Sequence, residues 1–148
     1  MAEPFPSAFA KPQESPGFLL WQVSNAWQRL QREALADLEI THVQFVLLAG
    51  VVWLHEDEAP LTQVRLAAHA RTDVMMTSQV VRALEAKRLI RRTPHPTDRR
   101  ARALAPTKSG RDLARRAVER VEKAYAQFFA VLGREMGELT RLLRRLTE

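Results

Sequence analysis

Apolar side chains recur at spacings of three and four residues early in the chain, which is the pattern of a helix that buries one face. Between residues 18 and 38 this stripe consists of Leu20, Val23, Trp27, Leu30, Ala34 and Leu38. Leu19 and Trp21 lie beside the stripe and widen it. So wide an apolar face predicts that the helix is buried against more than one surface.

A second helix is predicted from Val43 to about Leu54. Thr41 and Gln44 stand at the spacing of a capping box, in which each side chain bonds the backbone amide of the other residue. This helix is apolar on nearly all sides, so we expect it to form the centre of the core. The acidic triplet Glu56-Asp57-Glu58 ends it. We interpret the triplet as a solvated connection, since the alternative, a metal-binding loop, needs further ligands at suitable spacing.

Two short helices follow in quick succession. Thr62 is placed to cap a helix that runs to about His69, and Asp73 is placed to cap another over residues 74–88. Two helices joined by a turn of about four residues are typical of a helix-turn-helix motif. The sequence therefore predicts such a motif near the middle of the chain.

A β-hairpin is predicted directly after the second short helix. Its strands are expected at residues 89–93 and 101–105, with Pro94-His95-Pro96-Thr97-Asp98-Arg99-Arg100 between them. Two prolines and an aspartate between short segments indicate a hairpin loop. A hairpin in this position is interpreted as the wing of a winged helix.

The rest of the chain predicts two further helices. Pro106-Thr107 opens a long helix whose apolar stripe ends at Gly133, and a last helix follows. The stripes are formed by Val118, Val121, Tyr125, Phe128 and Leu132, and then by Met136, Leu139, Leu142, Leu143 and Leu146. Because a small three-helix core cannot cover so much apolar surface, we expect a dimer seam shared with the first helix. An intramolecular helical hairpin is the alternative.

These elements define the expected fold class: mainly α with a small β-hairpin wing, arranged as a winged helix-turn-helix with N- and C-terminal dimerisation helices. The winged helix is expected at about 41–106 and the dimerisation helices at about 18–38 and 107–147, within one domain of residues 17–148. Residues 1–16 contain four prolines and no apolar signal core, which predicts a flexible arm.

Composition excludes several classes of protein. The 46% of hydrophobic residues is typical of a globular chain. The absence of cysteine excludes disulfides, a thiol nucleophile and a cysteine-based zinc site. No apolar run approaches the roughly 18 residues that a membrane span requires. A cytoplasmic, nucleoid-associated protein without a membrane partner is therefore expected.

Positive charge is concentrated in the middle of the chain. Residues 61–120 carry fifteen basic and five acidic side chains, whereas residues 1–60 carry three and eight. A basic segment of this kind is typical of a surface that faces phosphate groups. A solvated basic face without a partner is the alternative.

The second short helix presents two chemically different faces. Thr77, Val80 or Val81, and Leu84 share the face that is expected to pack inward. The opposite face consists of Met75, Ser78, Gln79 and Arg82, with Met76 at its edge. Glutamine pairs with adenine, arginine reaches guanine or a phosphate, and methionine contacts thymine methyl groups in the major groove. This face therefore predicts DNA contact, although paired methionines more often pack inside a protein.

The hairpin tip carries a second candidate group, Asp98-Arg99-Arg100. A guanidinium on a protruding loop can enter the narrow minor groove, where negative potential is concentrated. The aspartate is expected to hold one arginine by an ion pair. A solvated tight turn is the alternative for the tip taken by itself.

Catalysis finds little support in the sequence. The four histidines, His42, His55, His69 and His95, lie in separate segments and share no carboxylate motif, and no glycine-rich phosphate loop occurs. We therefore expect no enzyme, no cofactor and no metal site. An effector pocket is predicted between the first two helices, with Trp21, Asn25, His42 and Phe45 as lining residues. The alternative is that Trp21 and Phe45 belong to the dimer core.

Four segments resemble the MarR family of bacterial multiple-antibiotic-resistance-type regulators. They are Leu38-Glu39-Ile40-Thr41-His42-Val43-Gln44-Phe45, Leu61-Thr62-Gln63-Val64-Arg65-Leu66-Ala67, Ser78-Gln79-Val80-Val81-Arg82-Ala83-Leu84-Glu85, and Asp98-Arg99-Arg100-Ala101 with Leu104-Ala105-Pro106-Thr107-Lys108-Ser109-Gly110. Their order and spacing agree with the family from about Gly17 to the C-terminus. The wing with its downstream T-x-x-G is the most specific segment.

The resemblance implies a homodimer that binds a pseudo-palindromic operator in double-stranded DNA. It also implies that Arg100 enters the minor groove and that Asp98 braces it. Most family members are repressors released by a small anionic, often aromatic, effector that binds between the dimerisation helices and the DNA-reading lobe. A protein-interaction module without specific DNA readout is the alternative function.

This chain departs from the family pattern in two respects. Arg88 stands where the family usually has the glycine that ends the recognition helix, so this helix is expected to end differently. A left-handed arginine is less stable than glycine by roughly 1 kcal/mol. The absence of cysteine excludes the peroxide-sensing branch of the family.

Overall fold

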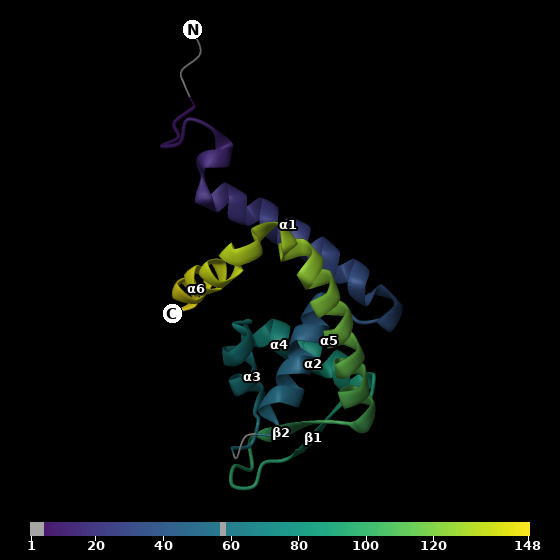
Figure 1. Cartoon of the computed structure of the whole chain (residues 1–148). Coiled ribbons are helices and arrows are strands. Elements are labelled where there is room, and N and C mark those ends of the chain that lie inside the picture. Colours follow the sequence, from purple (N-terminus) through teal and green to yellow (C-terminus); the bar gives the residue numbers. More distant parts are fainter. Residues whose placement is uncertain (1–4, 57–58) are drawn as a thin grey trace.

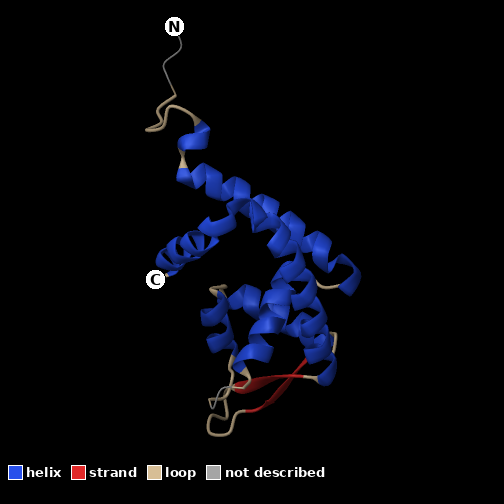
Figure 2. Cartoon of the chain, viewed as in Figure 1, coloured by secondary structure: helices blue, strands red, loops and turns tan. Residues whose placement is uncertain are grey.

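The computed structural model describes residues 5–56 and 59–148 as a helical chain with one two-stranded hairpin (Figure 2). This architecture confirms the predicted fold class. Residues 1–4 of the expected arm, and Asp57 and Glu58 of the acidic connection, lie outside the described residues. The elements follow the capping residues of the sequence closely.

The first helix, α1, spans Pro16–Leu35. A short 3-10 turn, η1, precedes it at Pro12–Glu14, and the Ser15 hydroxyl accepts a bond from the Phe18 amide at 3.3 Å. The predicted helix was to continue to Leu38, but the last three residues form a separate 3-10 turn, η2 (Ala36–Leu38). The backbone then passes through a left-handed conformation at Glu39 (φ 56°), which ends the helical run.

The helix α2, His42–Leu54, is the centre of the core as predicted. Both bonds of the Thr41–Gln44 capping box are present, at 3.1 and 3.2 Å. Leu47, Leu48 and Val51 are fully buried among residues from every neighbouring helix and from the hairpin. This burial explains why the sequence of α2 is apolar on nearly all sides.

Two short helices, α3 (Gln63–Ala70) and α4 (Val74–Ala86), pack on α2. The predicted caps are confirmed, since the Thr62 hydroxyl accepts from the Arg65 amide and the Asp73 carboxylate accepts from the Met76 amide. The turn between the helices uses a left-handed Arg71 (φ 52°). The pair forms the predicted helix-turn-helix.

Helix α4 ends at Ala86, two residues earlier than predicted, and Arg88 adopts the left-handed conformation (φ 57°). The expectation that the helix ends differently with arginine at this position is therefore wrong. The Leu89 amide bonds back to the Leu84 carbonyl and the Arg88 amide to the Glu85 carbonyl, both at 2.9 Å. These two bonds form the helix-ending motif that favours glycine at its left-handed position.

We expect the substitution Arg88→Gly to raise the free energy of unfolding by about 1 kcal/mol, because it removes the strain of a left-handed side chain. Arg88 is exposed, so little packing is lost. Urea denaturation at fixed protein concentration measures the change. The control Ala86→Gly, in the last helical position of α4, is expected to lower stability by roughly 0.5–1 kcal/mol. A loss of stability in Arg88→Gly would contradict the prediction.

The hairpin pairs β1 (Ile90–Pro94) with β2 (Arg102–Pro106) in antiparallel register. Ile90 and Leu104 point into the core and are almost fully buried. The Leu104 amide donates to the Leu61 carbonyl at 2.7 Å, which ties the hairpin to the segment before α3. The wing is therefore fixed at its base and free at its tip.

The long helix α5 spans Lys108–Phe129, and the 3-10 segment η3 (Ala130–Glu135) leads to α6 (Met136–Thr147). The predicted break at Gly133 is confirmed by its non-helical backbone (φ 48°, ψ −117°). The end of α5 packs on α1, where Trp27 contacts the aromatic rings of Tyr125, Phe128 and Phe129. An ion pair between Asp37 and Arg120 links η2 to α5 and holds the pKa of the Asp37 carboxyl below its usual range.

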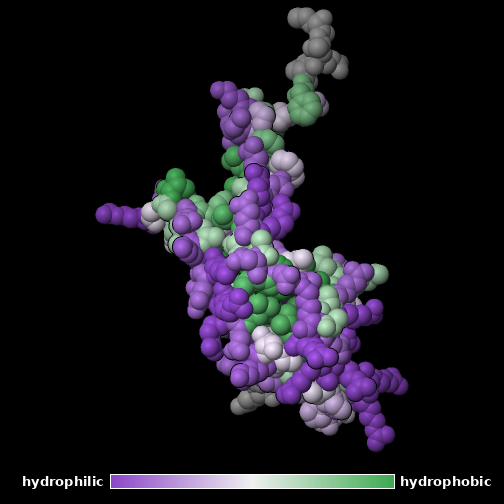
Figure 3. Space-filling view, turned by 90° about the vertical axis from the view of Figure 1, so that its right-hand side faces the viewer, coloured by the Kyte–Doolittle hydropathy of each residue, from purple (hydrophilic) through white to green (hydrophobic). Residues whose placement is uncertain are grey.

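Helix α1 extends away from the lobe that contains α2, α3, α4 and the hairpin, whereas α6 turns back beside that lobe (Figure 1). The guanidinium of Arg71, in the turn between α3 and α4, donates to the Thr147 carbonyl at the end of α6. Hydrophobic side chains remain at the surface of the molecule, as Figure 3 shows. Trp21 is 65% exposed on α1 and Leu146 is 78% exposed on α6. Among the described residues no single helix is long and apolar enough to cross a membrane; Pro16–Leu38 and His42–Leu54 meet that test only as a pair bent by 74°.

Candidate nucleic-acid interface

The turn before α4 is held by a small network of hydroxyl groups. The Thr77 hydroxyl donates to the Asp73 carbonyl at 2.8 Å and lies 2.7 Å from the Thr72 hydroxyl. Thr77 is fully buried, so these bonds satisfy a polar group that would otherwise destabilise the core. The network fixes the N-terminal turn of α4 relative to α3.

Helix α4 divides into the two faces that the sequence predicts. Thr77, Val80, Val81 and Leu84 are buried against α2 and α3. Gln79 and Arg82 are exposed one turn apart, Met75 is 75% exposed, and Ser78 is half-buried. The outer face thus offers donors, an acceptor and an apolar side chain of the kinds that read base edges in a major groove.

Met76 differs from the other four residues in its position. It is 41% exposed and lines the cavity described below, together with Thr72. The structure therefore places Met76 between the outer face of α4 and the cavity, whereas Met75 belongs to the outer face alone.

The tip of the wing, residues 95–101, carries Arg99 and Arg100, both exposed. The predicted ion pair of Asp98 with an arginine is wrong: in the described part of the chain the Asp98 carboxylate forms no ion pair with either guanidinium. It accepts instead from the backbone amide of Arg100 at 2.9 Å. Asp98 therefore shapes the backbone of the tip, and both guanidinium groups remain available to a partner.

Sequence reasoning missed the arginines of the wing strands. Arg91 and Arg102 are exposed on β1 and β2, and no ion pair within the described residues neutralises them. Arg92 is different, because its Nε lies 2.8 Å from the Glu85 carboxylate and ties β1 to α4. Strand alternation would have placed Arg91 on the opposite side from Arg92. The exposed positive charge thus extends along the hairpin from its tip.

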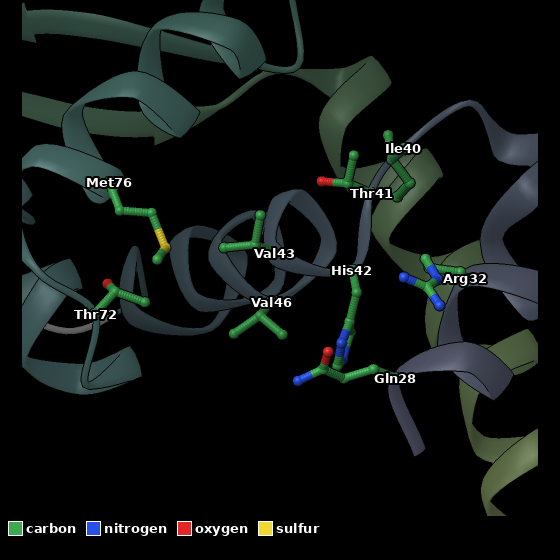
Figure 4. Close-up of a pocket in the computed structure, with 9 residues that line it drawn as sticks. All are labelled: Gln28, Arg32, Ile40, Thr41, His42, Val43, Val46, Thr72 and Met76. Atoms are coloured by element: carbon green, nitrogen blue, oxygen red, sulfur yellow. The ribbon is translucent and has the colours of Figure 1, made fainter. Parts of the chain in front are cut away.

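A cavity of about 570 Å³ lies between α1, α2 and the N-terminal turn of α4. Figure 4 shows Gln28 and Arg32 of α1 at one side, Thr72 and Met76 at the other, and Val43 and Val46 of α2 between them. His42 also lines it, and burial lowers the pKa of this imidazole. The cavity combines apolar walls with one permanent cation, Arg32, which is a lining suited to a small anion.

The four residues predicted for an effector pocket are not brought together in the single chain. His42 alone lines the cavity. Trp21 and Asn25 border a second hollow on the surface of α1, which shares Arg32 with the cavity, and Phe45 is buried in the core. Gln28, Arg32 and Thr72 were missed, because their convergence depends on the angle between α1 and the lobe and not on local spacing.

Comparison with known proteins agrees with this geometry. Residues 40–101 match the sequence profile of the MarR family. The chain is 44% identical over 124 residues to YdcH of Bacillus subtilis (strain 168), an HTH-type transcriptional regulator, and the match covers 84% of each protein. Identity at this level over this length establishes common ancestry and a shared fold.

Solved structures show the same arrangement of elements. BpsR of Bordetella bronchiseptica, whose DNA binding is regulated by 6-hydroxynicotinic acid, superposes with a TM-score of 0.84 at 24% identity, over 97% of this chain and 99% of that one. A mutant MarR from E. coli in complex with operator DNA gives 0.82 at 24% identity, over 95% and 100%. The chain therefore belongs to the MarR family of helix-turn-helix transcriptional regulators.

Proposed function

We propose that this protein is a ligand-responsive repressor that binds a pseudo-palindromic operator in double-stranded DNA as a homodimer, in the cytoplasm and on the nucleoid. The observation that carries the proposal is the pairing of an exposed Gln79–Arg82 face on α4 with an arginine-rich wing that is fixed at its base. Helix α4 would enter the major groove, and Arg100 would enter the adjacent minor groove.

The exposed apolar faces of α1 and α6 support dimerisation. Leu20, Trp21, Leu142, Leu143 and Leu146 are each at least 40% exposed in the single chain. Exposed apolar side chains concentrated on the first and last helices mark an interaction surface. We propose that a second copy of the chain covers these faces. The resulting dimer places two α4 helices at a fixed separation along the DNA.

The cavity supports control by a small anionic, aromatic effector. Its Arg32 supplies a positive charge, and its Met76 and Thr72 belong to α4 and to the turn that positions α4. A ligand in the cavity therefore contacts the recognition element directly. For the ligand to release DNA, it must bind the DNA-incompetent arrangement of the lobes more tightly than the competent one.

Substitution of the wing arginine tests DNA binding. We expect Arg100→Ala to weaken binding by about tenfold and to reduce the magnitude of the slope of log affinity against log salt by about two, one for the wing of each protomer. Fluorescence anisotropy with labelled DNA from the protein's own upstream region, against a scrambled competitor, measures both quantities. The control is Arg134→Ala, which removes an equal charge in η3, beyond the far end of α5.

Unchanged affinity in a folded Arg100→Ala dimer would overturn the role of the wing. Binding that shows no preference for the upstream sequence over the scrambled one would overturn operator recognition. That second result would favour a winged-helix module whose basic face binds an acidic protein partner.

A further inference from the structure

His95 is half-buried at the start of the wing tip, whereas residues 96–100 are exposed. Its Nδ1 atom lies 3.0 Å from the Asp98 amide and 3.2 Å from the Thr97 amide. Both amides donate, so Nδ1 must carry a free electron pair and the ring proton must reside on Nε2. The imidazole therefore acts as a cap that accepts hydrogen bonds from the Thr97 and Asp98 backbone N–H groups.

The bonds of His95 continue to Arg100 through Asp98. The His95 ring fixes the amide of Asp98, and the Asp98 carboxylate in turn accepts from the Arg100 amide at 2.9 Å. The Ala101 amide closes the turn on the Asp98 carbonyl at 3.3 Å. Side chains thus connect the start of the tip to the backbone of its arginine.

No glycine occurs between Gly50 and Gly110, so the tip does not take its shape from glycine conformations. Pro94 and Pro96 flank His95 and restrict the backbone on both sides of it. The turn from Thr97 to Ala101 is shaped by the side-chain acceptors His95 and Asp98, together with the backbone bond from the Ala101 amide to the Asp98 carbonyl. The loss of either acceptor leaves backbone donors of the tip without a partner in the chain.

We propose that His95 is a positioning residue for DNA binding. Through its Nδ1 acceptor, His95 holds the backbone of the tip so that Arg100 is in the conformation that enters the minor groove. This inference rests on the proposed function of the wing. A tip that is ordered before binding loses less conformational entropy when it docks, so the cap increases affinity without touching DNA.

Three substitutions of His95 separate the acceptor from the ring. Asparagine places its Oδ1 at nearly the position of Nδ1, glutamine moves its oxygen one bond further out, and alanine has no acceptor. We expect His95→Ala and His95→Gln to bind the upstream DNA about fivefold more weakly than the native protein, and His95→Asn to bind within twofold of it. Equal losses in the alanine and asparagine variants, or native affinity in all three, would overturn the proposal.

Coupling to Arg100 is tested by a double-mutant cycle. Because His95 acts through Arg100, the variant with both His95→Ala and Arg100→Ala should bind about as weakly as Arg100→Ala alone. Losses that multiply fully would overturn the positioning role.

Amide hydrogen exchange of Thr97 and Asp98, measured by NMR without DNA, distinguishes failure of this inference from failure of the proposed function. Faster exchange in His95→Ala, with native rates in His95→Asn, confirms the cap whether or not the wing binds DNA. Native exchange rates in the alanine variant would overturn the cap itself, whereas confirmed capping with no effect of Arg100→Ala on affinity would overturn the function of the wing.

Discussion

Replacement of Gly110 by alanine is expected to lower the free energy of unfolding by about 3–4 kcal/mol. Gly110 lies in the first turn of α5, and a Cβ atom there would stand 2.8 Å from the carbonyl carbon of Leu89 and closer still to its oxygen. Both partners are backbone, and neither side has a flexible side chain that can move aside. Relief of the clash requires α5 to separate from the start of the wing.

The backbone at this junction is also held by Thr107, the cap of α5. The Thr107 amide donates to the Leu89 carbonyl at 3.0 Å, its hydroxyl donates to the Arg88 carbonyl at 2.7 Å, and the same hydroxyl accepts from the Gly110 amide at 3.0 Å. Displacement of α5 by the added methyl group would therefore strain three hydrogen bonds in addition to the packing.

The matched control is Gly137→Ala in α6, where no atom of the described residues of the same chain lies within 4 Å of the added Cβ. There the substitution should be neutral or raise stability by up to about 1 kcal/mol, since alanine is the better helix former. Urea denaturation at one fixed protein concentration compares the two variants, because association adds to the stability of a dimer. Equal stability of Gly110→Ala and the native protein would show that the close approach is wrongly placed.

The contact between α5 and the start of the wing shows which features can be predicted from the sequence and which cannot. Four helices begin at a side chain that accepts a hydrogen bond from the amide three residues later. These capping residues are Thr41, Thr62, Asp73 and Thr107, so local spacing is sufficient to predict the helix starts. The role of Gly110 depends on the Leu89 carbonyl, 21 positions earlier. The T-x-x-G motif was recognised by resemblance, but its physical cause is a tertiary contact.

The same distinction applies to the candidate site. The outer face of α4 follows from helical periodicity, and Gln79 and Arg82 are exposed as predicted. The cavity joins residues of α1, α2 and the turn before α4, so no local pattern identifies Arg32 as part of it. In the wing the sequence indicated an ion pair for Asp98, because opposite charges were adjacent. The backbone amide of Arg100 proved to be the nearer donor.

Arg88 illustrates a competition between local and tertiary preferences. Its side chain disfavours the left-handed conformation, which led to the expectation of a different helix end. Leu89, however, is only 7% exposed, and the Thr107 hydroxyl donates to the Arg88 and Leu89 carbonyls. These contacts hold the chain reversal in place despite a local cost of roughly 1 kcal/mol.

The substitution Gln31→Met is expected to raise the free energy of unfolding by about 1–3 kcal/mol. Gln31 is completely buried, one turn after Trp27 and one turn before Leu35 on α1. Neither its amide oxygen nor its amide nitrogen has a hydrogen-bond partner among the described residues. Methionine has a similar length and flexibility, so it fills the same space without an unpaired polar group.

Urea denaturation of Gln31→Met is compared with Gln22→Met, an exposed position on the same helix, where a change within about 0.5 kcal/mol is expected. If only the substitution at position 31 raises the free energy of unfolding, the unpaired buried amide of Gln31 lowers the stability of the native protein. A loss of 1 kcal/mol or more would show instead that the amide is hydrogen-bonded in solution by an enclosed water.

Since Gln31 lies between Gln28 and Arg32 of the cavity wall in sequence, DNA binding and its response to aromatic acids should be measured on the same variant. Unchanged regulation with higher stability would place Gln31 in the folding of α1 and outside the effector response.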